Sequence, residues 1–117
     1  MKTTLTLEDK VNLIVELIKE KKGKDIISLK VKDLTPITDY FLICSGETEK
    51  QTQTIADFIL KILEEKGEKP LGVEGFTEGR WILIDYGDII IHIFKEDIRE
   101  FYGLEYLWGD VEIKKYD

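Results

Sequence analysis

The side chains best suited to chemistry lie within residues 73–108. Asp85 and Asp88 flank the dipeptide Tyr86-Gly87, and His92, the only histidine, follows them. Carboxylates beside a histidine form a ligand set that a divalent metal accepts. Aspartates beside a turn more often accept hydrogen bonds from backbone N–H groups. We therefore favour a structural role for this pair and expect no bound metal.

A hairpin that turns at Tyr86-Gly87 would place Asp85 opposite Asp88 and His92 near Trp81 on the same ladder. These side chains would then form a mixed polar and aromatic patch on one face of the sheet. This arrangement predicts a surface for binding a partner.

The aromatic residues in this stretch are too numerous for a small core to bury completely. We expect Phe94, Phe101 and Trp108 to pack the last helix on the sheet. Trp81 and Tyr102 neighbour charged residues, so they are the better candidates for an interface.

The dipeptide Ser45-Gly46 ends an expected strand just before a helix, a position where free N–H groups can bind phosphate. Neither GxxxxGK[ST] nor GxGxxG occurs in the chain, so this signal is weak. A nucleotidyltransferase would also need clustered carboxylates for Mg²⁺, and no alternating acidic pair follows Ser45-Gly46. Cys44 and His92 could form a nucleophilic pair, but a thiol in an apolar strand is typically protonated and inert.

Most of the negative charge lies in the same stretch. Residues 73–108 hold eight acidic and three basic side chains, in a chain of net charge -7. An acidic field with exposed aromatics favours a basic protein partner. A pI near 4.8 disfavours binding of free nucleic acid, which requires clustered cations. The one basic cluster follows a helical pattern, where cations suit the helix dipole; it comprises Lys19, Lys21, Lys22 and Lys24.

The length of 117 residues and the hydrophobic content of 43% fit one compact domain. We expect residues 1–110 to form that domain and residues 111–117 to be a loosely held C-terminal tail. The N-terminus shows no transit peptide, and no stretch approaches the roughly 18 apolar residues that a membrane span needs. We therefore expect a soluble cytoplasmic protein without a membrane partner.

Hydrophobic periodicity predicts an α/β fold, in which a mixed five-stranded sheet is flanked by helices in the order α-β-β-α-β-β-β-α. The first helix follows Thr6 and is expected to end at Gly23. Alternation over residues 27–31 predicts a strand with one buried face, and the apolar run 40–44 predicts a strand covered on both faces. The remaining expected elements are a helix over 48–67, strands over 71–74, 81–85 and 88–94, and a helix over 96–102.

Five motifs in this order resemble the ribosomal silencing factor, or Iojap-like, family: TDYFLICSG, QTQTIAD, PLGVEG, WILIDYGDIIIHIF and REFYGLEYLW. The resemblance extends from Leu7 to Trp108. It implies a non-enzymatic translation regulator without a cofactor, with a nucleotidyltransferase-like fold that lacks the catalytic acids. It also implies binding to the large ribosomal subunit through ribosomal protein L14, steric exclusion of the small subunit, and a homodimer when free.

The motif positions of this resemblance suggest seven partner-contact residues: Trp81, Asp85, His92, Arg99 and Tyr102, with Glu74 and Asp39 behind them. Trp81 is expected to be the apolar anchor, Asp85 to pair with a Lys or Arg of the partner, and His92 to orient that carboxylate or donate a hydrogen bond. Two alternatives remain open. One is an assembly factor for the large subunit, and the other is a residual nucleotide-binding module that requires Mg²⁺.

Overall fold

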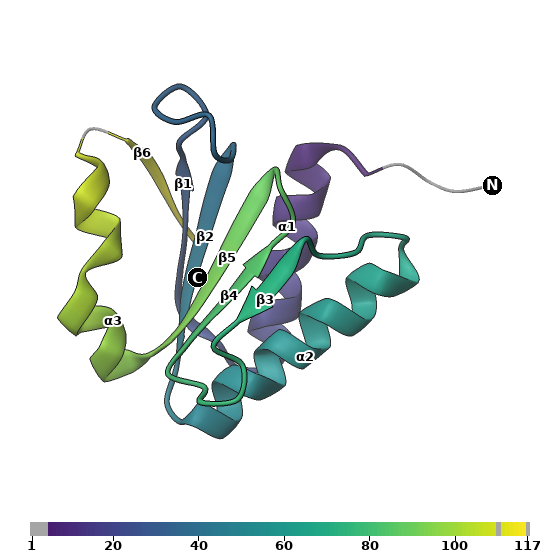
Figure 1. Cartoon of the computed structure of the whole chain (residues 1–117), viewed down its shortest axis with the longest axis vertical. Helices are drawn as coiled ribbons and strands as arrows, with labels where there is room; N and C mark the ends of the chain where they lie inside the picture. Colours follow the sequence, from purple (N-terminus) through teal and green to yellow (C-terminus); the bar gives the residue numbers. More distant parts are fainter. Residues whose placement is uncertain (1–4, 110, 117) are drawn as a thin grey trace.

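The structure is a computed structural model that describes residues 5–109 and 111–116. Its helices are interspersed among the strands along the chain (Figure 1). The elements are α1 (Leu7–Glu20), β1 (Lys24–Lys30), β2 (Tyr40–Gly46), α2 (Glu49–Glu65), β3 (Gly72–Glu74), β4 (Trp81–Asp85), β5 (Ile89–Lys95), α3 (Glu96–Tyr102), the 3-10 helix η1 (Leu104–Trp108) and β6 (Glu112–Tyr116). The mixed α/β class that the sequence predicts is confirmed.

The sheet has six strands in the order β3-β4-β5-β2-β1-β6, one more than expected. Strands β2 and β5 are parallel, and the other neighbouring pairs are antiparallel. The expectation of a loose tail after residue 110 is wrong, because β6 pairs with β1 along its length. The Tyr116 hydroxyl and the Ser28 hydroxyl, 3.0 Å apart, add a side-chain hydrogen bond to this edge pairing.

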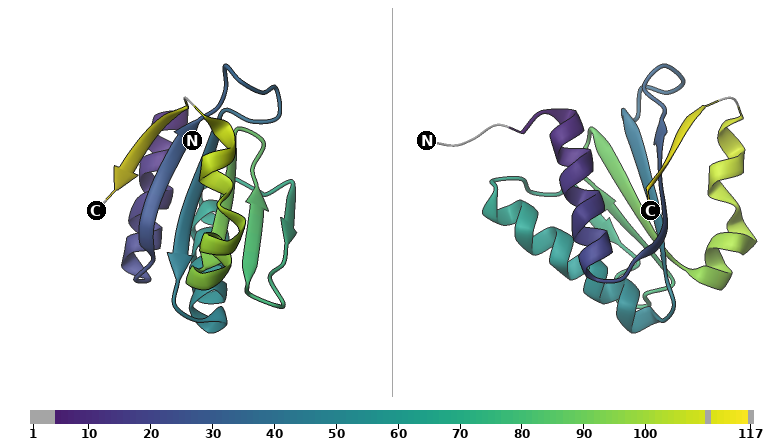
Figure 2. Two further views of the ribbon diagram at one scale, coloured as in Figure 1. Left: turned by 90° about the vertical axis from the view of Figure 1, so that its left-hand side faces the viewer. Right: turned by 180° about the vertical axis from the view of Figure 1, so that it is seen from behind.

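The sheet lies between two unequal helical layers. Helices α1 and α2 cover one face, and α3 with η1 lies against the other (Figures 1 and 2). The larger core fills the α1–α2 side and includes Ile14, Ile18, Ile55, Ile59, Leu63, Leu42, Ile91 and Ile93. The smaller core lies under α3 and includes Ile27, Leu29, Phe41, Ile43, Ile90 and Phe94. Strand β1 contributes to both cores, with Ile26 in the larger one and Ile27 and Leu29 in the smaller one, whereas its alternating sequence predicted one buried face.

Helix α1 begins as expected but ends in a different way. The Thr6 hydroxyl accepts a hydrogen bond from the Asp9 N–H, as the capping pattern predicts. The left-handed residue after the helix is Lys22, with φ 68°, and not Gly23. Gly23 is required for space, because a Cβ there would lie 2.2 Å from Cγ2 of Ile18. In the described residues no helix is both long and apolar enough to span a membrane.

The β4–β5 hairpin pairs two residues out from the expected register. Asp85 lies opposite Ile90 and not opposite Asp88. The tip of the turn is shifted by one residue to Gly87-Asp88, because the Tyr86 N–H donates to the Ile89 carbonyl at 2.9 Å. The Asp85 carboxylate accepts a hydrogen bond from the Gly87 N–H at 2.8 Å and so stabilises this turn. Asp88 instead pairs with Lys10 of α1 at 3.0 Å. Both carboxylates therefore have the structural roles that we favoured.

Candidate partner-binding face

Alternate residues of β4 point to the side of the sheet that α3 covers. Trp81 and Asp85 share this side with Leu83, and Glu74 of β3 joins them because it pairs with Leu83. Tyr102 of α3 packs on Trp81, with ring centroids 5.0 Å apart. We call this group the β4 face: Glu74, Trp81, Leu83, Asp85 and Tyr102. All five side chains are at least partly exposed, so they can contact another molecule.

Trp81 is held in a fixed orientation at the centre of the β4 face. Its ring stacks on Phe94 with centroids 4.8 Å apart. Its indole Nε1 donates a hydrogen bond to Nδ1 of His92 at 3.0 Å. The remaining edge is open, since the residue is only partly buried. A large aromatic side chain that is already immobilised loses little conformational entropy on binding, which suits an anchor.

His92 lies behind Trp81 and is only 4% exposed. Burial lowers the pKa of its imidazole from 6.5 to about 4, so the ring is neutral near pH 7. Because Nδ1 accepts from Trp81, the proton of the neutral ring is on Nε2, which is buried without a hydrogen-bond partner in the described part of the chain. His92 therefore positions Trp81, and the expected role of orienting Asp85 does not match this geometry.

The buried imidazole makes the stability of the protein depend on pH. The unfolded chain takes up a proton near pH 6.5, and the folded chain does so only near pH 4. The free energy of unfolding is therefore fully maintained above pH 6.5 and declines as the pH falls towards 4. The decline amounts to about 3 kcal/mol, at ~1.4 kcal/mol per pKa unit. Urea denaturation of wild type and His92→Gln at pH 7 and pH 4.5 tests this.

The variant retains an acceptor for Trp81 but cannot titrate, so its stability should change less between the two pH values. Carboxylates titrate equally in both proteins. The difference between their losses of unfolding free energy from pH 7 to pH 4.5 is therefore the contribution of His92. Equal declines would show that His92 is not a buried neutral group.

Arg99 is buried under α3, with 9% of its surface exposed, and does not lie on the β4 face. Its Nη1 donates to the Asp25 carbonyl at 2.6 Å and to the Ser45 hydroxyl at 2.8 Å. Asp25 has a φ of 49°, an unfavourable value for a non-glycine residue, at an irregularity in the β1–β2 pairing. Arg99 thus ties α3 to β1 and β2, a role that its sequence position did not reveal.

The other candidates are distributed over the sheet. Asp39 precedes β2, and its N–H donates to the Asp88 carbonyl at 3.2 Å, so it lies at the end of the sheet where β5 begins. Phe94 is fully buried as expected, but Phe101 is 81% exposed and does not close the core. The side chain of Trp108 lies outside the described part of the structure. Burial raises the pKa of the Cys44 thiol to about 12, in agreement with an unreactive cysteine.

Leu83 is the one residue of the β4 face that sequence reasoning did not select. It lies between Trp81 and Asp85 on the same side of the strand and is half-buried. The alternation in WILID already placed it there, but an isolated leucine attracts little attention in a sequence.

These features describe an α/β domain with a mixed sheet, one face of which exposes a fixed tryptophan among carboxylates. The model of the family described as "ribosomal silencing factor during starvation" matches residues 4–117. The chain therefore belongs to the ribosomal silencing factor, or RsfS, family.

Individual relatives agree with this assignment. A protein of Halalkalibacterium halodurans named ribosomal silencing factor RsfS is 41% identical over 103 residues, which cover 88% of each protein. A crystal structure of a Chromobacterium violaceum protein matches with a TM-score of 0.87 and 31% identity, covering 90% of this chain and 88% of the other. A Mus musculus protein named mitochondrial assembly of ribosomal large subunit protein 1 is 28% identical, and the match covers 84% of this chain and 44% of the mouse protein.

Proposed function

We propose that this protein is a translational repressor that binds the large ribosomal subunit through ribosomal protein L14 and sterically prevents the small subunit from joining. The observation that carries the proposal is the family match along residues 4–117. The β4 face is the surface that we assign to L14. Its role is binding and not catalysis, in keeping with relatives that are named as silencing factors.

The chemistry of the β4 face suits a basic protein. Trp81 and Leu83 supply apolar area, and Asp85 and Glu74 border it with negative charge. Such a rim attracts Lys and Arg side chains and repels the phosphates of ribosomal RNA, so it favours the protein component of a mixed surface. The anchor supplies affinity, and the carboxylates supply orientation and selectivity.

The proposal is tested by co-sedimentation with purified large subunits, followed by a binding titration with isolated L14. We expect saturable binding to large subunits and to L14, and none to purified small subunits. Changing Asp85 and Glu74 together to Lys should weaken L14 binding at least tenfold, because each carboxylate is replaced by a charge that repels a basic partner. Unchanged binding by this variant would remove the β4 face from the contact.

A role in large-subunit assembly is the second candidate, and the name of the mouse relative favours it. Assembly and silencing would use the same contact, so they differ in timing and not in site. An assembly factor would be required for normal yield of large subunits in growing cells. Sucrose-gradient profiles of a deletion strain during growth and during starvation separate the two functions.

A residual nucleotide-binding module has less support. Among residues 5–109 and 111–116, no three His, Cys, Asp or Glu side chains are grouped to hold a metal ion. Asp85 is bonded to the Gly87 N–H, and Asp88 is paired with Lys10. Burial lowers the pKa of Lys10, but its hydrogen bonds to Glu68 and Asp88 outweigh burial and raise the pKa above its usual value. Calorimetric titration with ATP and Mg²⁺ would detect such binding, which should be lost in Asp85→Asn if this alternative holds.

A further inference from the structure

Strand β6 brings additional cations to the lysine cluster at the end of α1. Its residues Lys114 and Lys115 pair with Ser28 and Ile27 of β1, and β1 begins at that cluster. We call this group the β6 lysine patch: Lys19, Lys21, Lys22, Lys24, Lys114 and Lys115. Residues 19–25 hold four lysines and two acids, and residues 112–116 hold two lysines and one acid. The patch is thus locally positive in a chain of net charge -7.

The sequence alone suggested that the first four lysines only complement a helix dipole. That interpretation does not extend to Lys114 and Lys115, which lie on a strand. Lysines on an edge strand also discourage pairing with other sheets, but this role does not require them to lie beside a second lysine cluster. The two segments meet at the β6 edge of the sheet, where Lys114 lies on the α1 side with Tyr116 and Lys115 lies on the α3 side. The lysines thus border this edge with positive charge from both faces.

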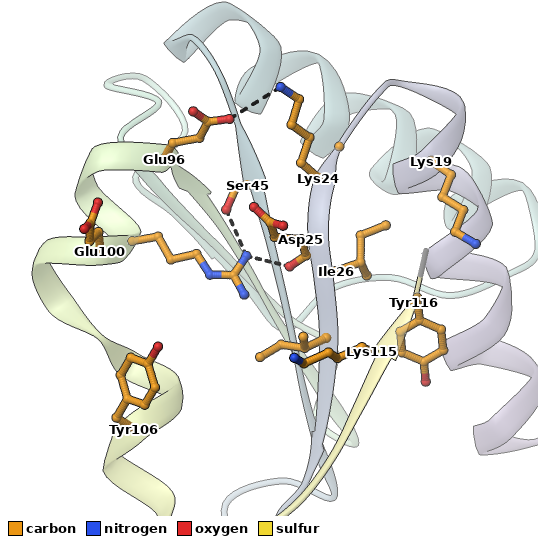
Figure 3. Close-up of a pocket in the computed structure, with 13 residues that line it drawn as sticks. Lys19, Lys24, Asp25, Ile26, Ser45, Glu96, Glu100, Tyr106, Lys115 and Tyr116 are labelled. Atoms are coloured by element: carbon orange, nitrogen blue, oxygen red, sulfur yellow. Dashed lines mark hydrogen bonds and ion pairs between the residues drawn. The ribbon is translucent and has the colours of Figure 1, made fainter.

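An open pocket of about 940 Å³ lies between this part of the sheet and α3 (Figure 3). Lys24 and Lys115 line it opposite Glu96 and Glu100 of α3, and Lys19 of α1 lies across β1 from Lys115. Lys24 is already engaged, since it bonds to Glu47 and lies 3.7 Å from Glu96. An anion would therefore be repelled by the α3 side of the pocket. It would be attracted to the five lysines of the patch other than Lys24, which we call the outer lysines.

Those outer lysines are available to a partner. Within residues 5–109 and 111–116, none of the five forms an ion pair. Lys21 and Lys114 lie over the rings of Phe58 and Tyr116, at 4.5 Å and 5.1 Å from the ring centroids. These contacts position the ammonium groups and leave their charges uncompensated. The set is Lys19, Lys21, Lys22, Lys114 and Lys115.

The part of the patch at Lys24 lies at the same end of the sheet as Trp81. Trp81 pairs with Phe94, Phe94 with Ser45, and Ser45 with Lys24. This row crosses β4, β5, β2 and β1, so Trp81 and Lys24 are separated by roughly 14 Å at about 4.8 Å per strand. A partner that extends across this end of the sheet and around the β6 edge can therefore reach the aromatic anchor and the lysines together.

We propose that the β6 lysine patch binds the phosphodiester backbone of large-subunit RNA beside the protein that the β4 face contacts. This inference rests on the proposed function. Lysines that neutralise phosphates release counterions, so their contribution falls steeply with salt. The net negative charge keeps the free protein off RNA, but docking of the β4 face would raise the local concentration of phosphates to about the millimolar range. The patch thus strengthens a complex that the β4 face selects.

The test compares two variants that lose the same charge. The patch variant carries Lys19→Gln, Lys22→Gln and Lys115→Gln. The control carries Lys61→Gln, Lys66→Gln and Lys69→Gln, which replace exposed lysines on and after α2. Binding of each to purified large subunits is measured between 50 and 300 mM KCl, a range within which phosphate contacts lose several orders of magnitude in affinity.

We expect the patch variant to bind large subunits about 100-fold more weakly at 50 mM KCl, with a salt slope shallower by about 2, at ~0.7–0.9 per phosphate contact. The control should match wild type, and all three proteins should bind isolated L14 equally. Equal behaviour of the two variants on subunits would overturn the proposal. A loss that also appears with isolated L14 would assign the lysines to protein instead of RNA. A wild-type protein that binds neither subunits nor L14 would contradict the proposed function itself, a different result.

Discussion

Trp81→Ala should lower the affinity for large subunits by about 30- to 1,000-fold, which corresponds to roughly 2–4 kcal/mol for a central aromatic anchor. The substitution removes the partly exposed ring that stacks on Phe94 and packs on Tyr102. Co-sedimentation over a range of subunit concentrations measures the loss. We expect all of the variant protein to bind, but more weakly, because the carboxylates of the β4 face remain.

The same substitution also destabilises the fold, by about 3 kcal/mol, because a packed tryptophan is lost. In addition, Nδ1 of the buried His92 loses its hydrogen-bond donor. Circular dichroism must therefore show that the variant is folded at the assay temperature. Trp81→Phe, which retains a stacked ring, should bind better than Trp81→Ala. Tyr106→Ala is the matched control, because Tyr106 is 83% exposed and lies on η1. A folded Trp81→Ala protein with wild-type affinity would exclude Trp81 from the contact.

Arg99→Met should reduce the free energy of unfolding by about 2–4 kcal/mol, because it leaves buried polar groups without their charged donor. The groups affected are the Ser45 hydroxyl and the Asp25 carbonyl, which accept from Nη1. Arg99→Lys should restore little of this loss, since one ammonium does not reproduce the planar guanidinium. Urea denaturation of the purified variants measures both effects.

Arg80→Met is the matched control for this substitution, because Arg80 is exposed. Its stability should stay within about 0.5 kcal/mol of wild type. Subunit binding by Arg99→Met should fall only as far as the folded fraction falls and as the packing of Tyr102 on Trp81 weakens. If Arg99 were a partner contact, as its motif position suggested, stability would be unchanged and binding would be lost.

Hydrophobic periodicity was sufficient to predict the main elements. Helix 96–102, the strands at Trp81 and Tyr40, and the caps at Thr6 and Thr48 all agree with the structure. Strand β6 was missed because its residues are largely exposed and carry charges, so no buried alternation marks it. Its partner, β1, provides the hydrogen bonds that make it a strand. A long-range pairing of this kind has no local signal in the sequence.

The candidate site was predicted only in part, for a related reason. The alternation in WILID correctly put Trp81 and Asp85 on one side of a strand. The expected hairpin also put His92 near Trp81, although in a different register. The sequence did not show that His92 and Arg99 are buried, because polar residues on a strand and a short helix usually face solvent. Their burial depends on where α3 docks, and that packing becomes visible only in three dimensions.

Subunit joining is the most direct test of the central claim. Light scattering after mixing purified large and small subunits follows the formation of complete ribosomes, and the protein is added to the large subunits beforehand. We expect the joining signal to fall in proportion to occupancy and to approach zero at saturation, while Trp81→Ala requires far higher concentrations. Normal joining at saturating, demonstrably bound wild-type protein would contradict the steric mechanism.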